Sequence, residues 1–233
     1  MSRVAVVTGA RKGLGKGLAE RLLSAGYAVV GCGRGECSWQ HNHFRYLRLD
    51  VSQEQDVKTL IREAVEVGPP YAVINNAATA SMNHTLLTPA TSLDDMLASN
   101  VRSTFLVSRE AAKVMRKTGV GRIVNISSVA VPLRLAGQAA YVAAKAAVER
   151  LTQVMARDLG DLGITVNVVG PAPTATDMIR GVPPDKIERL IQSFPIKRLG
   201  TIDDVWNAVE FFLRPESEAV TGQILYLGGT PNG

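Results

Sequence analysis

Tyr141 and Lys145, in the segment Y-V-A-A-K, are the residues of this chain best suited to acid–base chemistry. Side chains four residues apart on a helix lie on one face, one turn from each other. A free tyrosine titrates near pH ~10, and a neighbouring ammonium lowers that pKa because it favours the phenolate. The pair therefore predicts a tyrosine that exchanges a proton near neutral pH, although the same spacing also arises by chance on many helices.

The composition is that of an ordinary globular protein. The chain has 233 residues, of which 46% are hydrophobic and 20% charged, so it can bury a full core. It has no run of about 18 apolar residues, and we expect no membrane span. The N-terminal segment lacks the apolar stretch of a secretory signal, so a cytoplasmic protein is expected. Cys32 and Cys37 should then stay reduced, and their spacing does not favour a metal or redox role.

A mild positive charge leaves several partners open. The formal net charge is +5 and the isoelectric point is about 9.4. Basic residues are scattered and interleaved with acids, so no nucleic-acid partner is expected, whereas a phosphorylated cofactor would suit this charge. No metal-binding set is visible, and His41, His43 and His84 are expected to be loop residues.

Apolar runs alternate with helical patterns from end to end. Strands are expected at 3–8, 28–31, 45–49, 72–75, 122–126, 165–169 and 223–227, and helices at 14–25, 54–67, 93–117, 138–159, 185–194 and 202–213. This alternation predicts crossover connections and a mostly parallel sheet covered on both faces. The expected fold class is α/β, with residues 1–233 forming a single doubly wound Rossmann domain around a seven-stranded sheet.

The first expected strand runs into T-G-A-R-K-G-L-G, residues 8–15, and then into a helix. Gly9 can form a tight turn, and Gly13 lets the backbone approach a phosphate closely. The helix start offers free N–H groups and a positive dipole end to a pyrophosphate. Strand, turn and helix together predict a dinucleotide site. The glycine spacing nevertheless differs from the GxGxxG fingerprint, and a plain turn is the alternative.

Charge after the second strand indicates which dinucleotide is bound. Enzymes that use NAD place an acid there, which repels a 2′-phosphate. In this chain Gly33 stands at that position and Arg34 follows it, while Arg11 and Lys12 lie in the glycine loop. Arginine and lysine make charge-assisted hydrogen bonds to phosphate. NADP(H) is therefore expected, with a solvated Arg34 as the alternative.

Seven segments in order resemble the motifs of the compact short-chain dehydrogenase/reductases, over nearly the whole chain. They are T-G-A-R-K-G-L-G (8–15), L-D-V (49–51), N-N-A-A (75–78), Asn100, I-S-S (126–128), Y-V-A-A-K (141–145) and V-N-V-V-G-P-A-P-T-A-T (166–176). The resemblance implies NADPH-dependent reduction of a ketone or aldehyde to an alcohol by hydride transfer. The subgroup with the most similar overall pattern is the 3-oxoacyl-[acyl-carrier-protein] reductases.

The resemblance also implies roles for individual residues. Tyr141 would be the general acid, and Ser128, rather than its neighbour Ser127, would donate a hydrogen bond to the substrate oxygen. Lys145 would bind the nicotinamide ribose and lower the Tyr141 pKa, and Asn100 would hold a water that links Lys145 to solvent. Besides Tyr141 and Lys145, the implied cofactor contacts are Thr8, Gly9, Arg11, Lys12, Gly13, Leu14, Gly15, Arg34, Asp50, Val51, Asn75, Asn76, Ala77, Ala78, Pro171, Thr174 and Thr176. Ala78 and Ala172 depart from the family pattern, which has glycine at both positions.

The expected substrate pocket is lined by residues 78–81, 129–135, 173 and 178–194. Most of these are apolar, so an apolar or amphipathic carbonyl compound is expected. Arg134 could hold an anionic substrate group or simply reach solvent. A mobile lid is expected within 178–194.

Binding to an acidic carrier protein is less clear from the sequence. The two carrier-docking arginines of the subgroup correspond to Gly119 and Leu162 here, although Arg116, Lys117 and Arg122 could substitute. A ketoreductase of secondary metabolism fits equally well, and a non-catalytic NADP-binding sensor or scaffold is the alternative of another class.

The family is commonly oligomeric, so a homotetramer or homodimer is expected. The contact would run through residues 93–117 and 138–159. Small side chains allow helices to approach closely, and the second segment supplies alanines at 139, 140, 143, 144, 146 and 147.

Overall fold

Seven parallel strands form the centre of the computed structural model, which describes residues 3–174 and 184–229. The strands are β1 (Val4–Thr8), β2 (Ala28–Gly33), β3 (Phe44–Arg48), β4 (Pro70–Asn75), β5 (Gly121–Ile126), β6 (Ile164–Gly170) and β7 (Ile224–Tyr226). Their order across the sheet is β3-β2-β1-β4-β5-β6-β7, and every pairing is parallel. The expected α/β doubly wound fold is confirmed.

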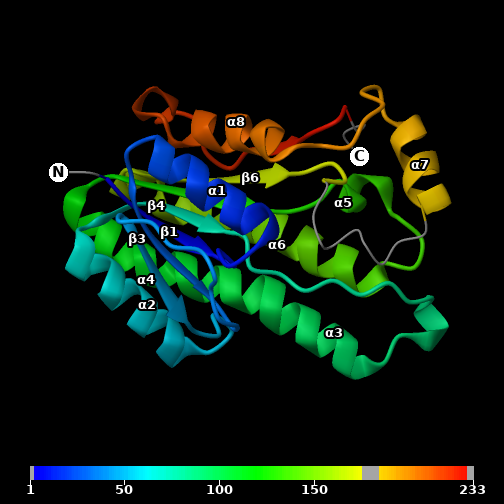
Figure 1. The fold of residues 1–233 in the computed structure, drawn as a ribbon, viewed down its shortest axis with the longest axis horizontal. Helices are drawn as coiled ribbons and strands as arrows, with labels where there is room; N and C mark the ends of the chain where they lie inside the picture. Colours follow the sequence, from blue (N-terminus) through cyan, green and yellow to red (C-terminus); the bar gives the residue numbers. More distant parts are fainter. Residues whose placement is uncertain (1–2, 175–183, 230–233) are drawn as a thin grey trace.

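Helices cover both faces of this sheet (Figure 1). One face packs against α1 (Gly13–Ser24) and α8 (Ile202–Leu213), through side chains such as Leu18 and Phe212. The other face packs against α2 (Glu54–Val67), α4 (Ser103–Thr118) and α6 (Ala139–Leu159), through side chains such as Leu60 and Met115. Burial on both faces explains why the central strands are continuous apolar runs without alternation.

The shorter elements lie in the connections. They are η1 (Thr85–Leu87), α3 (Ala90–Met96), η2 (Leu97–Arg102), α5 (Ala130–Leu133), η3 (Gly160–Leu162), α7 (Pro184–Ser193) and η5 (Pro215–Ser217). Helix α7 stands apart from the sheet in Figure 1, near α5. Of the described helices, none is long and apolar enough to cross a membrane.

The helical region expected at 93–117 contains an irregularity that the sequence pattern did not indicate. It consists of α3, the π-helical turn η2 and α4. Side chains compete for the backbone acceptors here: Asn100 donates to the Met96 carbonyl at 2.9 Å and Thr104 donates to the Asn100 carbonyl at 2.7 Å. A wider turn of this kind is rare and often occurs at functional sites. Here it places Asn100 in the interior.

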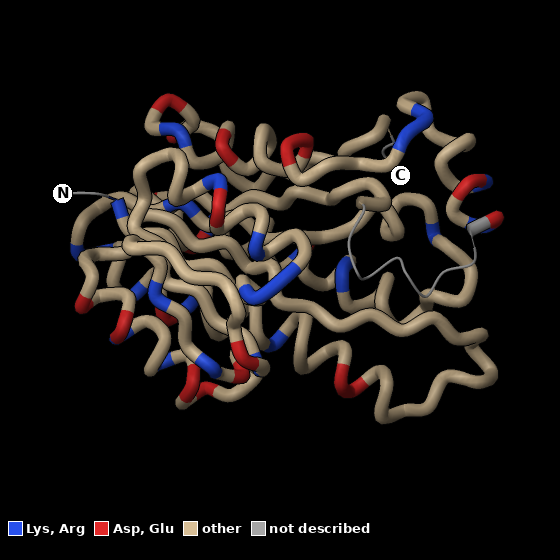
Figure 2. Tube along the Cα trace, viewed as in Figure 1, with Lys and Arg blue, Asp and Glu red and all other residues tan. Residues whose placement is uncertain are grey.

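Positions of Lys and Arg are interspersed with positions of Asp and Glu along the helices in Figure 2. The alternation is visible along α2 and α4. An example is the ion pair between Arg109 and Glu54, 2.7 Å apart, which joins these two helices.

Candidate active site

A cavity of about 1360 Å³ lies where the strands reach their carboxyl ends. Ligands of open parallel sheets bind at this edge, where the strand order reverses. The cavity brings together most of the expected cofactor contacts: Gly9, Arg11, Lys12, Gly13, Leu14, Gly15, Arg34, Asp50, Val51, Asn76, Ala77, Ala78, Tyr141, Lys145, Pro171 and Thr174. Thr176 lies outside the described residues.

The glycine loop has the shape of a phosphate cradle. Gly9 and Gly13 have φ values of 70° and 57°, in the left-handed region, which glycine adopts without strain. A Cβ on Gly15 would lie 2.3 Å from the Gly9 carbonyl oxygen. A side chain at residue 15 is therefore excluded, and the start of α1 directs its N–H groups at whatever occupies the loop.

Thr8 does not line the cavity, in contrast to its expected role. It is buried, and its Oγ1 accepts hydrogen bonds from the backbone N–H groups of Asn76 and Ala77 at 3.0 and 2.9 Å. Asn76 in turn donates from Nδ2 to the Thr8 carbonyl at 3.0 Å. Thr8 thus joins the glycine loop to the loop after β4.

The structure gives the two neighbouring asparagines of the N-N-A-A motif different positions, and only one of them lines the cavity as expected of a cofactor contact. Asn75 is buried within β4 and donates to Ser108 and to Asn125, both at 2.8 Å. Asn76 lines the cavity and Asn75 does not. Asn75 is therefore an interior residue that couples β4 to β5 and α4.

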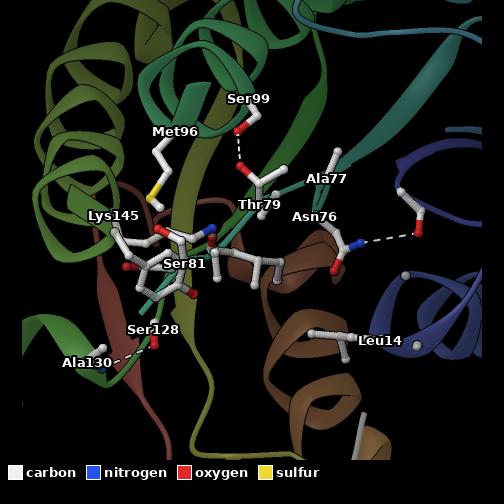
Figure 3. A pocket seen from close by; sticks show the side chains of 18 of the residues that line it. Leu14, Asn76, Ala77, Thr79, Ser81, Met96, Ser99, Ser128, Ala130 and Lys145 are labelled. Carbon is white, nitrogen blue, oxygen red and sulfur yellow. Dashed lines mark hydrogen bonds between the residues drawn. The ribbon is translucent and has the colours of Figure 1, made fainter. Parts of the chain in front are cut away.

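Tyr141, Ser128 and Lys145 line the other half of the cavity, and Figure 3 labels the last two of them. Tyr141 and Lys145 come from the first turns of α6, and Ser128 follows β5. Lys145 is buried, and its Nζ donates to the carbonyl of Ile126 at 2.7 Å. The Lys145 Nζ lies 5.9 Å from the centre of the Tyr141 ring. A phenol, a hydroxyl and an ammonium thus share one wall.

The two serines after β5 have different partners. Ser128 Oγ accepts the N–H of Ala130 at 3.1 Å and faces the cavity (Figure 3). Ser127 Oγ donates to a carboxylate oxygen of Glu149 at 2.6 Å, and Ser127 is 3% exposed. Because the Ser127 hydroxyl already donates its only proton to Glu149, Ser128 is the hydroxyl that can donate a hydrogen bond to a substrate.

The expected lowering of the Tyr141 pKa is absent from this structure. Burial raises the pKa of Tyr141, and a hydrogen bond with Ser128 opposes that rise only in part. Burial also lowers the pKa of Lys145 to about 8, while the nearby Glu149 carboxylate raises it. The expectation considered the positive charge of Lys145, which lowers the pKa of a phenol, and left out the burial of Tyr141, which raises it.

Glu149 is a functional candidate that the sequence reasoning missed. Its side chain is 4% exposed, and burial raises its pKa while a hydrogen bond with Ser127 lowers it. It lies one helical turn beyond Lys145, on the same face of α6. The available signal was this spacing, which repeats the four-residue step from Tyr141 to Lys145.

Asn100 does not line the cavity and is 1% exposed. Its Nδ2 donates to the carbonyls of Met96 and Thr79 at 2.9 and 3.1 Å. Its Oδ1 is buried and lacks a hydrogen-bond partner among the described residues. Buried polar atoms are rarely left in this state, so Asn100 fits the expected role of holding a water.

The substrate side of the cavity differs in part from the expected wall. Residues 78–81, Val129, Ala130, Leu135 and Pro173 line it as expected, and α7 contributes Lys186, Ile187 and Leu190. The expectation for residues 131–134 is wrong, because α5 turns this segment away from the cavity. Arg134 is exposed at the end of α5, and so reaches solvent. Met178 lies outside the described residues.

Asp95, Met96 and Ser99 also line the cavity, and the sequence reasoning did not include them. They come from α3 and η2. This region was expected to be part of a single helix in a contact between copies of the chain, and it was not expected at the cavity. In the described part of the chain, no group of three or more His, Cys, Asp or Glu side chains is arranged to hold a metal ion.

Comparisons with known proteins agree with this geometry. A family model described as enoyl-(acyl carrier protein) reductase matches residues 9–229. A 3-oxoacyl-[acyl-carrier-protein] reductase of Vibrio cholerae is 32% identical over 97% of this chain and 96% of its own length. A short-chain type dehydrogenase/reductase of Picea abies is 34% identical over 97% of this chain and 91% of its own. The chain therefore belongs to the short-chain dehydrogenase/reductase family and is an NADP(H)-dependent oxidoreductase of carbonyl and CH–OH groups.

Proposed function

We propose that this protein reduces the ketone of a 3-oxoacyl thioester with NADPH, and that residues 1–233 act as one domain in doing so. The observation that carries the proposal is the wall formed by Tyr141, Ser128 and Lys145 at the inner end of the cavity. Curated relatives named 3-oxoacyl-[acyl-carrier-protein] reductase support the substrate class.

The cavity residues suit the reductive direction. When bound, the cofactor supplies the hydride. Burial keeps Tyr141 protonated, since it raises the pKa of the phenol, and a protonated phenol can donate to a developing alkoxide. Ser128 donates a second hydrogen bond to the same oxygen, which stabilises negative charge without reorganisation.

Lys145 and Asn100 would serve the proton supply. With a pKa of about 8, Lys145 carries its charge at neutral pH and can still release a proton. A water held by the unpartnered Oδ1 of Asn100 would connect the ammonium to solvent. Each group donates or accepts at an atom that the structure leaves available for that purpose.

The substrate side favours an acyl chain. Met82, Met96, Leu135, Ile187 and Leu190 line it, and apolar walls of this kind bind alkyl groups. Delivery by a carrier protein has weaker support, because Arg122 is buried and donates to the carbonyl of Gly121 at 3.0 Å. Arg122 therefore cannot replace a docking arginine, and only Arg116 and Lys117 are exposed for that role.

The test follows NADPH oxidation at 340 nm with a short 3-oxoacyl thioester, in the native enzyme and in Tyr141→Phe. Loss of a positioned general acid costs about 10²- to 10⁴-fold in rate, so turnover should fall at least 100-fold while the NADPH Kd changes less than threefold. Unchanged turnover would refute the assigned role. Binding of NADPH without turnover of any carbonyl compound would favour the sensor or scaffold alternative.

We also propose that the protein is a homotetramer. An apolar groove on the outer face of η2, α4 and α6 is lined by Leu97, Val101, Phe105 and Leu151, and Val154 nearby on α6 is 57% exposed. Phe211 and Leu225, at the β7 edge, are about two-fifths exposed, with values of 41% and 40%. Two separate apolar faces suit two kinds of contact between copies.

The alanines of α6 divide between these surfaces and the interior. Ala140 and Ala144 are buried against Met96 and Ala130 within the chain, so they do not serve an interface as expected. Ala139 and Ala143 are exposed. Light scattering at micromolar concentration should give the mass of four chains, and a monomer would contradict the proposal.

A further inference from the structure

Tyr46 of β3 lies against Gly33, the residue that stands where NAD-dependent enzymes of this fold carry an acid. A Cβ built on Gly33, the last residue of β2, would lie 2.8 Å from the Tyr46 hydroxyl oxygen. Real Cβ atoms do not approach an oxygen so closely. The next nearest atom, the Tyr46 ring carbon that bears the hydroxyl, would be 3.8 Å away, which is an ordinary contact. A single oxygen atom therefore excludes a side chain at residue 33.

That oxygen is also anchored. The Tyr46 hydroxyl donates to the carbonyl of Gly35 at 2.7 Å, and the ring packs at a tilt against Phe44, with 6.2 Å between ring centres. Burial raises the pKa of Tyr46 to about 12, so the phenol stays a donor over the working pH range. Displacing it costs a hydrogen bond and the contact with Phe44.

The same bond shapes the loop that carries Arg34. Gly35 follows Arg34 directly, and the Arg34 carbonyl accepts a hydrogen bond from Arg48 Nε at 3.1 Å. Two side chains of β3 thus hold this loop: Tyr46 donates to the Gly35 carbonyl, and Arg48 donates to the Arg34 carbonyl. A Cβ on Gly35 would lie 3.2 Å from the Arg11 guanidinium, so the Arg11 side chain lies close against this loop.

We propose that Tyr46 is a specificity-determining residue that keeps the nucleotide site selective for a 2′-phosphate. It excludes an acid at residue 33 and holds the Arg34 loop beside Arg11. The inference rests on the proposed function, since it concerns the nucleotide that this function uses. Residue 33 is then glycine because the Tyr46 hydroxyl leaves no room for a Cβ there. The effects of substitutions at the two positions must therefore depend on each other.

Nucleotide binding to four proteins tests this coupling: the native chain, Tyr46→Phe, Gly33→Asp and the double variant. Titration calorimetry at fixed salt gives the Kd of NADPH and of NADH. Tyr46→Phe should reduce the preference for NADPH by about three- to tenfold, because the loop loses one of its two anchors. Gly33→Asp alone should weaken both nucleotides at least tenfold, because the aspartate displaces the phenol and the loop.

The double variant should bind NADH at least tenfold more tightly than Gly33→Asp does, since removal of the hydroxyl makes room for the aspartate at the ribose. If Gly33→Asp changes NADH affinity by the same factor with and without the Tyr46 hydroxyl, the inference is wrong. Tyr27→Phe, at the opposite end of β2, is the matched control and should leave the preference unchanged.

Thermal unfolding without nucleotide separates this inference from the proposed function. Gly33→Asp should lower the Tm by several degrees in the native background and by much less in Tyr46→Phe. Equal shifts in both backgrounds would refute the steric part of the inference. If the native chain binds neither nucleotide, the proposed function fails, and this comparison still decides whether the Tyr46 hydroxyl excludes residue 33 from carrying a side chain.

Discussion

Replacing Lys145 by methionine should stabilise the fold relative to the native chain most strongly at neutral pH. Burial lowers the Lys145 pKa from 10.5 to about 8, so the native state binds this proton less tightly than the unfolded state does. A shift of that size corresponds to about 3 kcal/mol of native-state penalty when the lysine is charged. Methionine of similar length removes the charge and keeps most of the packing.

The sign of the pH dependence follows from linkage. Below pH 8 both states hold the proton, and the full penalty is present. Between pH 8 and 10.5 the unfolded state binds more protons than the native state, so native stability rises with pH. From pH 7 to pH 10 the native chain should gain about 2 to 3 kcal/mol relative to Lys145→Met.

The loss of the hydrogen bond to the Ile126 carbonyl opposes the gain. A hydrogen bond from a charged donor contributes about 1.5 to 3 kcal/mol, so the net stabilisation at pH 7 should be about 1 kcal/mol, with turnover abolished. The pH-dependent part is free of this offset, because methionine lacks the bond at every pH.

Urea unfolding at pH 7 and pH 10 measures both quantities. Lys117→Met, which changes an exposed lysine near the end of α4, is the matched control and should show no pH-dependent difference from the native chain. A constant difference between the native chain and Lys145→Met from pH 7 to pH 10 would refute the reasoning, since it would mean that the buried ammonium carries no penalty.

Four further variants test the remaining parts of the site. Gly15→Ala should weaken NADPH binding at least tenfold in calorimetry, because the added methyl meets a backbone carbonyl at 2.3 Å; an unchanged Kd would mean that the loop does not cradle the cofactor. Ser128→Ala should lower kcat by about 10²- to 10³-fold, whereas Ser127→Ala should cost mainly stability, about 1.5 to 3 kcal/mol, because it removes one of the hydrogen bonds of the buried Glu149 carboxylate; the reverse result would exchange their roles. Glu149→Gln removes a charge that raises the Lys145 pKa, so the limb of the kcat pH profile that reports Lys145 should move to lower pH, and an unmoved profile would exclude this coupling.

The fold and the chemistry-bearing positions could be predicted because both depend on short-range patterns. The run at residues 4–8, entirely buried in β1, and the glycines that follow it indicate strand, turn and helix by local rules. The spacing of Tyr141 and Lys145 needs only helical geometry. Placing Thr8 behind the cavity required knowledge of which loop lies beside it, and that partner, Asn76, is 68 residues away in the chain.

Electrostatics was less predictable, because it depends on burial as well as on neighbours. The charge of Lys145 is evident from the sequence, but the depth of Tyr141, 8% exposed, depends on how α6 packs against α3 and α5. Gly33 is a second example. The sequence shows that no acid stands at this position, which suggests NADP(H). The reason that we propose for the missing acid, a tyrosine on the neighbouring strand, is a tertiary contact that the sequence does not show.

The π-helical turn illustrates how a polar residue can alter a helix without a local sequence signal. Residues 93–117 have a helical pattern throughout, and serine, asparagine and threonine inside it are compatible with a regular helix. Their side chains nevertheless take backbone acceptors one turn away, and Asn100 also reaches across to the Thr79 carbonyl at 3.1 Å. That tertiary bond favours a widened turn at this position. The irregularity therefore follows from a contact with the loop after β4. The Oδ1 atom of the same Asn100 amide has no hydrogen-bond partner among the described residues, so it can hold the water that we propose for the proton path of Lys145.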